Sequence, residues 1–187
     1  MQKLPVINEE ELSVKPLEVA ETSPSSWYTS HEMLDMENDA IFAKMWQYVG
    51  RLDQVQNSGD HFISEIAGES VLIVCGKDSV LRGFYNVCRH RGGPLATENG
   101  CGAVLQCKYH GWTYSLDGSL RGVPDFDRVE LFDKSDFGLV PIPIETWQGL
   151  IFANLDNDAL PLSYYMEGVA ERIMPQDISS YKFYLNL

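Results

Sequence analysis

The sequence has no apolar stretch of the roughly 18 residues that a membrane-spanning helix requires. Its first residues, Met1 to Glu11, also lack the basic start and the apolar run of a secretion signal. Basic residues are scarce, because 14 lysines and arginines stand against 27 aspartates and glutamates, giving a net charge of −13. We therefore expect a cytoplasmic protein that binds neither a membrane nor nucleic acid.

Cysteine and histidine are also scarce, with four of each in 187 residues. Cys75 ends an apolar run, and we expect it to pack as a small buried hydrophobic residue. Cys101 lies in a Gly-Cys-Gly turn, where we expect partial exposure. A disulfide between these two cysteines would be unusual in a cytosolic protein. His31 and His61 stand alone in the sequence, so we expect neither to be a metal ligand.

The other two cysteines and two histidines form two short motifs, Cys88-x-His90 and Cys107-x₂-His110, separated by sixteen residues. Each motif follows a strand-like run and precedes a glycine that permits a tight turn. Two thiolates and two imidazoles on two loops suit a [2Fe–2S] cluster in which two histidines replace two cysteines on one iron. We assign Cys88 and Cys107 to one iron and His90 and His110 to the other. Neutral imidazoles in place of thiolates raise the potential from about −400 mV to about −150 to +300 mV.

The two spacings alone leave other interpretations open. Two cysteines and two histidines also suit a single zinc ion in a zinc-stabilised interaction domain. The four side chains could also lie in a core without any metal. The residues that flank the motifs are needed to decide among these interpretations.

The N-terminal quarter differs in character from the rest of the chain. Residues 1–26 are polar with three prolines, and we expect an extended arm. Within residues 27–47, methionines and aromatic residues recur at helical spacing from about residue 30, and Thr29 and Glu32 have the spacing of a capping box. We therefore expect an amphipathic helix whose apolar stripe packs in the core. A further helix is expected over residues 161–174.

From Tyr48 onward, short apolar runs alternate with turn signals, which is typical of a mostly β protein with an antiparallel sandwich or barrel. Asp117-Gly118, between two such runs, predicts a two-residue hairpin turn. The expected strands are His61–Ile66, Val71–Val74, Val80–Val87, Ala103–Gln106, Trp112–Leu116, Ser119–Gly122, Leu139–Glu145 and Leu150–Leu155.

The flanks of the two motifs resemble the Rieske signature of the α subunits of ring-hydroxylating oxygenases. This is the Rieske non-heme iron oxygenase family, which includes choline-monooxygenase-like members. The similar segments are Cys88–Leu95 and Cys107–Gly118, including an arginine after the first histidine and a tryptophan two places after the second. The likeness extends over about residues 27–160.

The resemblance implies a Rieske domain of the ISP-like fold over residues 48–157, with a small cluster-binding subdomain that holds one [2Fe–2S] cluster. Residues 158–187 would then form a linker and the start of a catalytic domain that this sequence lacks. The residues that would lie beside the ligands, as candidates for electron transfer, are Arg89, Arg91, Tyr109 and Trp112.

The resemblance also implies a place in an O₂-dependent oxygenase. In that family a reductase or ferredoxin reduces the cluster. The electron then passes to a mononuclear Fe(II), typically in a neighbouring subunit of a homotrimer or α3β3 assembly. That iron is held by two histidines and one carboxylate, and no His-x₄-His pair follows His110 here. We therefore expect no catalytic residues in this chain, with His110 facing the neighbouring subunit. A free-standing Rieske-type ferredoxin is the alternative.

Partner and substrate are less defined by the sequence. Six basic side chains gather around the motifs: Arg82, Arg89, Arg91, Lys108, Arg121 and Arg128. They are either ordinary solvated charges or a docking surface for an acidic redox partner. Aromatic acids and quaternary amines are both substrates in the resembling family, and our expectation leans to aromatic ring hydroxylation.

Overall fold

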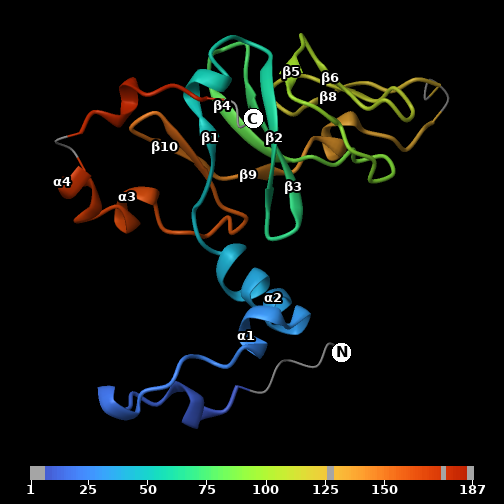
Figure 1. The fold of residues 1–187 in the computed structure, drawn as a ribbon. Coiled ribbons are helices and arrows are strands. Elements are labelled where there is room, and N and C mark those ends of the chain that lie inside the picture. Colours follow the sequence, from blue (N-terminus) through green and yellow to red (C-terminus); the bar gives the residue numbers. More distant parts are fainter. Residues whose placement is uncertain (1–6, 126–128, 174–175, 185–187) are drawn as a thin grey trace.

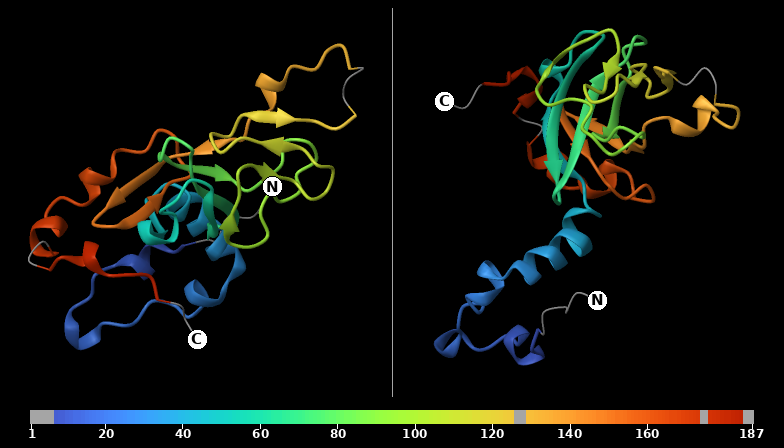
Figure 2. Two further views of the ribbon diagram at one scale, coloured as in Figure 1. Left: turned by 90° about the horizontal axis from the view of Figure 1, so that it is seen from above. Right: turned by 90° about the vertical axis from the view of Figure 1, so that its right-hand side faces the viewer.

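The computed structural model describes residues 7–125, 129–173 and 176–184 (Figure 1). Strands and loops from Gln47 onward gather into one β domain, and the residues before it form a helical arm that points away from that domain (Figures 1 and 2). The expected mostly β, antiparallel fold is confirmed.

The largest sheet has five antiparallel strands in the order β5-β2-β3-β4-β9. The central strand, β3, is an unbroken apolar run whose residues Val71 to Val74 are completely buried. Such a run requires a strand covered on both faces. The strands are β2 (Asp60–Ile66), β3 (Glu69–Cys75), β4 (Leu81–Tyr85), β5 (Gly100–Cys101) and β9 (Pro141–Ile142).

A second sheet, with the order β1-β11-β10, covers one face of the first. Its strands are β1 (Gln47–Arg51), β10 (Ile144–Trp147) and β11 (Leu150–Ala153). The two sheets meet where Ile151 packs with Phe62 and Ile73, and burial of this apolar surface drives the pairing of the layers. Cys75 lies in the same cluster and is buried, as expected.

The third sheet is small and forms the subdomain that carries the two motifs. Its strands are β6 (Leu105–Gln106), β7 (Thr113–Tyr114) and β8 (Leu120–Gly122). The expected β7–β8 hairpin is confirmed, but its loop has three residues, because Ser115 N–H pairs with the Ser119 carbonyl across it (2.9 Å). Gly118 ends this loop with φ of +89°, and an added Cβ would lie 2.5 Å from the Phe84 ring.

The expected helix over residues 27–47 starts close to the expected residue but is interrupted and ends early. It is divided into α1 (Ser26–Thr29) and α2 (His31–Glu37), and α2 continues as a π-helical turn only to Phe42. Ser30, rather than Thr29, caps α2, because its hydroxyl accepts the Met33 N–H (3.1 Å). The last residue of the expected helix, Gln47, begins β1 because it pairs with β11.

The apolar stripe of this helix is not part of the core, contrary to expectation. Met33 is buried, but Leu34 and Ile41 are each 49% exposed. The reason is the projection of the arm away from the sheets (Figure 2). The arm is joined to the rest of the chain by hydrogen bonds from the Trp46 indole to the Leu160 carbonyl (2.8 Å) and from the Asn154 side-chain amide to the Lys44 carbonyl (3.3 Å).

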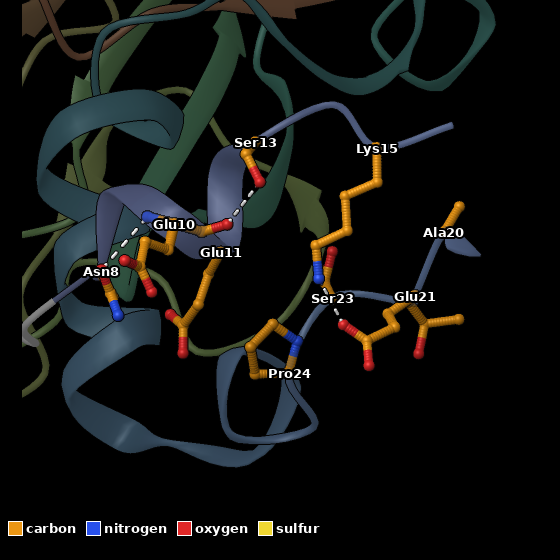
Figure 3. A pocket seen from close by; sticks show the side chains of 10 residues that line it. Asn8, Glu10, Glu11, Ser13, Lys15, Ala20, Glu21, Ser23 and Pro24 are labelled. Atoms are coloured by element: carbon orange, nitrogen blue, oxygen red, sulfur yellow. Dashed lines mark hydrogen bonds and ion pairs between the residues drawn. The ribbon is translucent and has the colours of Figure 1, made fainter. Parts of the chain in front are cut away.

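The arm itself encloses a shallow polar hollow (Figure 3). Asn8 accepts the Glu10 N–H (3.1 Å) at one side, and Lys15 pairs with Glu21 (2.6 Å) at the other. Both charged side chains are exposed, so this ion pair adds little stability. None of the described residues that line the hollow is a cysteine or a histidine.

The C-terminal part of the described chain packs back onto the β domain. In place of one helix over residues 161–174, there are two short helices, α3 (Leu162–Tyr165) and α4 (Val169–Ile173), with residue 174 outside the described residues. Gly168, with φ of +74°, separates them. Farther on, the buried Arg51 guanidinium donates to the carbonyls of Ile178 and Tyr181.

Among the described residues, none of the helices has the length and apolar character needed to cross a membrane.

Candidate metal centre

The two motifs form loops with the same backbone structure. The carbonyl of Cys88 accepts the N–H of Gly92, and the carbonyl of Cys107 accepts the N–H of Gly111, both at 3.0 Å. The two glycines have φ of +73° and +75°, a conformation that a residue with a Cβ rarely adopts. Each cysteine N–H also donates to the carbonyl five residues ahead, at 2.8 and 2.9 Å. The expected glycine turns are confirmed, and the two loops present their side chains in matching ways.

The loops bring the four candidate ligands together in two pairs. Cys88 and Cys107 are both buried in the core cluster that lies beneath the loops. Burial raises the pKa of the Cys88 thiol, and the adjacent Cys107 side chain raises it further, against a lowering hydrogen bond from Tyr114. The imidazole rings of His90 and His110 lie 4.7 Å apart between centroids, edge to face, and both are half-buried. Sulfur donors thus lie inward and nitrogen donors outward.

The arrangement of the four side chains distinguishes a site for a single zinc ion from a site for a cluster of two irons. A single zinc ion needs its ligands around one point, at about 2.0 to 2.3 Å. Across the described residues, no three side chains of histidine, cysteine, aspartate or glutamate converge in that way. A cluster with two irons instead needs one pair of ligands for each iron. A sulfur pair and a nitrogen pair fit that requirement.

Tyr114 is a residue of the site that the sequence interpretation missed. It is fully buried on β7, and its hydroxyl lies 3.4 Å from the Cys88 sulfur while it accepts the Arg89 N–H (3.0 Å). Burial, together with the Cys88 contact, raises the pKa of Tyr114, so the hydroxyl keeps its proton and can donate a hydrogen bond to the sulfur when Cys88 is a thiolate. Tyr114 lies in a strand of only two residues, and the sequence around it does not predict a contact with Cys88.

We expect Tyr114→Phe to lower the reduction potential of a cluster bound to Cys88. The hydroxyl stabilises negative charge on the sulfur, which is greater after reduction. Loss of about 1 kcal/mol of this differential stabilisation corresponds to about 40 mV for a one-electron couple. Redox titration measures the shift. Tyr109→Phe removes a hydroxyl from an exposed ring and is the matched control, expected to be neutral.

Asn86 is a second residue that the sequence interpretation missed. It is buried at the end of β4, and its side-chain oxygen accepts the N–H groups of Leu95 (3.1 Å) and Ala96 (3.0 Å). Its amide nitrogen donates to the Ala96 carbonyl (2.8 Å). These bonds fix the end of the first loop against the strand that begins it, so the side chain acts as a brace for Cys88 and His90.

The four residues expected beside the ligands occupy different environments. Arg89 and Arg91 are exposed on the first loop. Tyr109 packs against His110 with ring centroids 3.9 Å apart, yet it is 67% exposed. Trp112 is only 2% exposed and stacks on the His90 ring, 4.8 Å away and nearly parallel at 9°.

The basic residues around the motifs are partly neutralised. Arg82 forms a two-point ion pair with Asp78, at 2.7 and 2.8 Å. Lys108 lies 3.9 Å from Glu98, with both side chains exposed. Arg128 falls outside the described residues. Arg89 and Arg91, both exposed, are the basic residues of the first loop.

The remaining histidines and cysteines lie elsewhere, as expected. His31 is the first residue of α2 in the arm. His61 lies on β2, and its ring contacts the Gly59 carbonyl (3.0 Å). Cys101 is exposed on β5. Cys75 and Cys101 are both free thiols, without a disulfide between them.

Comparison with known proteins gives this geometry a context. Residues 45–133 match the family model of the Rieske [2Fe-2S] domain. The chain is 40% identical over 174 residues to the carnitine monooxygenase oxygenase subunit of Acinetobacter baumannii, covering 92% of this chain and 46% of that protein. It is 38% identical over 132 residues to the chloroplastic choline monooxygenase of Arabidopsis thaliana, covering 71% of this chain and 31% of that protein.

Solved structures agree with these relatives. A quaternary ammonium Rieske monooxygenase in complex with L-carnitine is similar with a TM-score of 0.81 and 39% identity, over 87% of this chain and 47% of that chain. Naphthalene 1,2-dioxygenase is similar with a TM-score of 0.74 and 30% identity, over 78% of this chain and 34% of that chain. The chain spans less than half the length of the curated relatives it matches. It belongs to the Rieske [2Fe–2S] proteins, and its relatives are the subunits of Rieske oxygenases.

Proposed function

We propose that this chain is the electron-transfer part of a Rieske oxygenase. In this proposal Cys88 and Cys107 hold one iron of the cluster, and His90 and His110 hold the other. The observation that carries it is the separation of the donors into a buried sulfur pair and an outer imidazole pair on two matching loops. When bound, the cluster supplies a site that accepts and releases one electron at a time.

The chain's own residues prepare the site for that chemistry. The strand ends and glycine turns hold the four donors, and the Asn86 brace fixes the first loop. The Tyr114 hydroxyl, 3.4 Å from the Cys88 sulfur, would donate a hydrogen bond to the thiolate. The half-buried histidines lie nearer the surface than the buried cysteines. We therefore assign entry and exit of the electron to the imidazole side.

The relatives of this chain favour a different class of substrate from the aromatic compounds expected from the sequence. An expectation of aromatic ring hydroxylation is too specific, because the relatives at 34 to 40% identity are named for carnitine and choline. We propose a quaternary ammonium substrate, oxidised with O₂ at a mononuclear iron. With four histidines in the sequence and two assigned to the cluster, that iron would be held in the part of the relatives outside the match.

The alternative, a free-standing electron carrier, is less well supported. Similarity to the carnitine monooxygenase subunit extends over 92% of this chain, well beyond the 45–133 segment that matches the Rieske domain itself. A carrier that needs only the cluster sheet has no reason to share its flanks with an oxygenase.

An exchange experiment distinguishes these functions. The 187 residues would replace the matching half of the carnitine monooxygenase oxygenase subunit, and carnitine oxidation would be measured with the reductase of that enzyme. We expect the chimaera to oxidise carnitine and the 187-residue protein alone to be reduced without consuming carnitine. A chimaera that carries a reducible cluster but never oxidises carnitine would favour the free carrier. Sustained carnitine oxidation by the 187 residues alone would contradict the assignment of the second iron.

We also expect the exposed arginines of the first loop to guide an acidic reductase or ferredoxin. Arg89→Glu with Arg91→Glu should slow reduction by such a donor by about tenfold at low salt, and the difference should shrink as salt screens the charges. Stopped-flow reduction at several salt concentrations measures this. Arg172→Glu on α4, an exposed charge outside the two loops, is the control and should match the unmodified protein.

A further inference from the structure

The two candidate histidine ligands lie in unequal surroundings. Trp112 covers one face of the His90 ring and is itself buried, whereas the ring that packs on His110 belongs to the largely exposed Tyr109. Both covering rings come from the second loop, but they differ in what packs behind them.

Behind Trp112 stand two phenylalanines from a segment that follows β8. Phe132 and Phe137 both meet the indole edge to face, with centroids 5.6 and 5.8 Å away, and stack on each other at 4.8 Å. We name these three residues, Trp112, Phe132 and Phe137, the aromatic wall. Edge-to-face rings at these separations attract one another beyond their burial of apolar surface.

The segment that supplies the phenylalanines is itself anchored. Asp133 caps the 3₁₀ turn that ends at Phe137, because its carboxylate accepts the Ser135 N–H (2.9 Å). Lys134 donates to the Arg121 carbonyl on β8 (3.2 Å). The aromatic wall is therefore held between the small sheet and this turn, and contacts outside the two loops support its position over His90.

We infer that Trp112 is a positioning residue for His90, which it orients and shields from water with the support of Phe132 and Phe137. This inference rests on the proposed ligand role of His90. Water next to a cluster stabilises the more negatively charged reduced state, so an apolar cover on one side lowers the potential. The aromatic wall thus makes His90 the shielded ligand and leaves His110 as the ligand open to partners.

The test uses the purified protein with its cluster loaded and quantified by iron and acid-labile sulfide. We expect Trp112→Ala to raise the reduction potential and to change the ¹⁵N hyperfine coupling of one histidine in pulsed EPR. Trp112→Phe keeps a ring over His90, so its reduction potential and hyperfine coupling should lie close to those of the unmodified protein. Tyr109→Ala, which removes a ring that water already surrounds, should change the potential much less and is the matched control.

A loaded Trp112→Ala protein with the potential and coupling of the unmodified protein would overturn the inference. An equal rise in Tyr109→Ala would also overturn it. If the Trp112→Ala protein does not bind a cluster, the Phe137→Leu variant is measured instead. We expect Phe137→Leu to raise the reduction potential by a smaller amount, and an unchanged potential would contradict the inference. An unmodified protein that never holds a [2Fe–2S] cluster would instead refute the proposed function, so the two failures are distinguishable.

Discussion

Cys107→Ser is expected to yield a protein without a [2Fe–2S] cluster, with the red-brown colour and the acid-labile sulfide lost. Iron–sulfur clusters require soft thiolate ligands, and a serine hydroxyl is a poor substitute for one. Cys107 is buried beside Cys88, whereas Cys75 packs in a different core cluster and Cys101 is exposed on β5. Iron and sulfide analysis of the purified variant, together with its visible spectrum, measures the loss.

Cys101→Ser is the matched control for this experiment. It makes the same chemical change at an exposed cysteine on β5, and Cys101 is a free thiol outside the two loops. This variant should keep the full cluster content of the unmodified protein. Loss of the cluster in Cys101→Ser, or its retention in Cys107→Ser, would show that the ligands are assigned to the wrong cysteines.

The second large effect is expected on the reduction potential of His90→Cys. An anionic thiolate in place of a neutral imidazole disfavours the additional negative charge of the reduced state. Two such replacements separate Rieske centres from all-cysteine clusters by about 250 mV or more, so one should lower the potential by on the order of 100 mV or more. Redox titration of the loaded variant, monitored by EPR, gives the value.

The control is His61→Cys, at a histidine that contacts the Gly59 carbonyl on β2 and lies outside the two loops. Its potential should equal that of the unmodified protein. If His90→Cys and His61→Cys had the same potential with full clusters, His90 would not be a ligand.

The sequence predicts the site well where the site is local. Each motif with its glycine specifies a loop closed by a hydrogen bond from residue i+4 to residue i, and the structure shows this at both Cys88 and Cys107. Three strands of the main sheet, β2, β3 and β4, are also predicted closely, since they are short apolar runs bounded by turns. Strand β5 is missed, and the expected strand Leu139–Glu145 is divided between β9 and β10.

The parts that the sequence did not predict depend on contacts between distant segments. The Tyr114 hydroxyl contacts Cys88, which is 26 residues away in the sequence, and no local sequence pattern predicts that contact. Phe132 and Phe137 reach Trp112 only after the segment beyond β8 folds back. Strand β1 was missed for the same reason, because its pairing with β11 overrides a helical pattern in residues just before it.

The central claim is that the two loops hold a [2Fe–2S] cluster rather than one metal ion. Metal and acid-labile sulfide analysis of the purified protein, with EPR spectra before and after reduction by dithionite, tests it most directly. The account predicts about two iron atoms and two sulfides per chain and an EPR signal that develops on reduction. One zinc ion per chain, with neither sulfide nor an EPR signal, would contradict it.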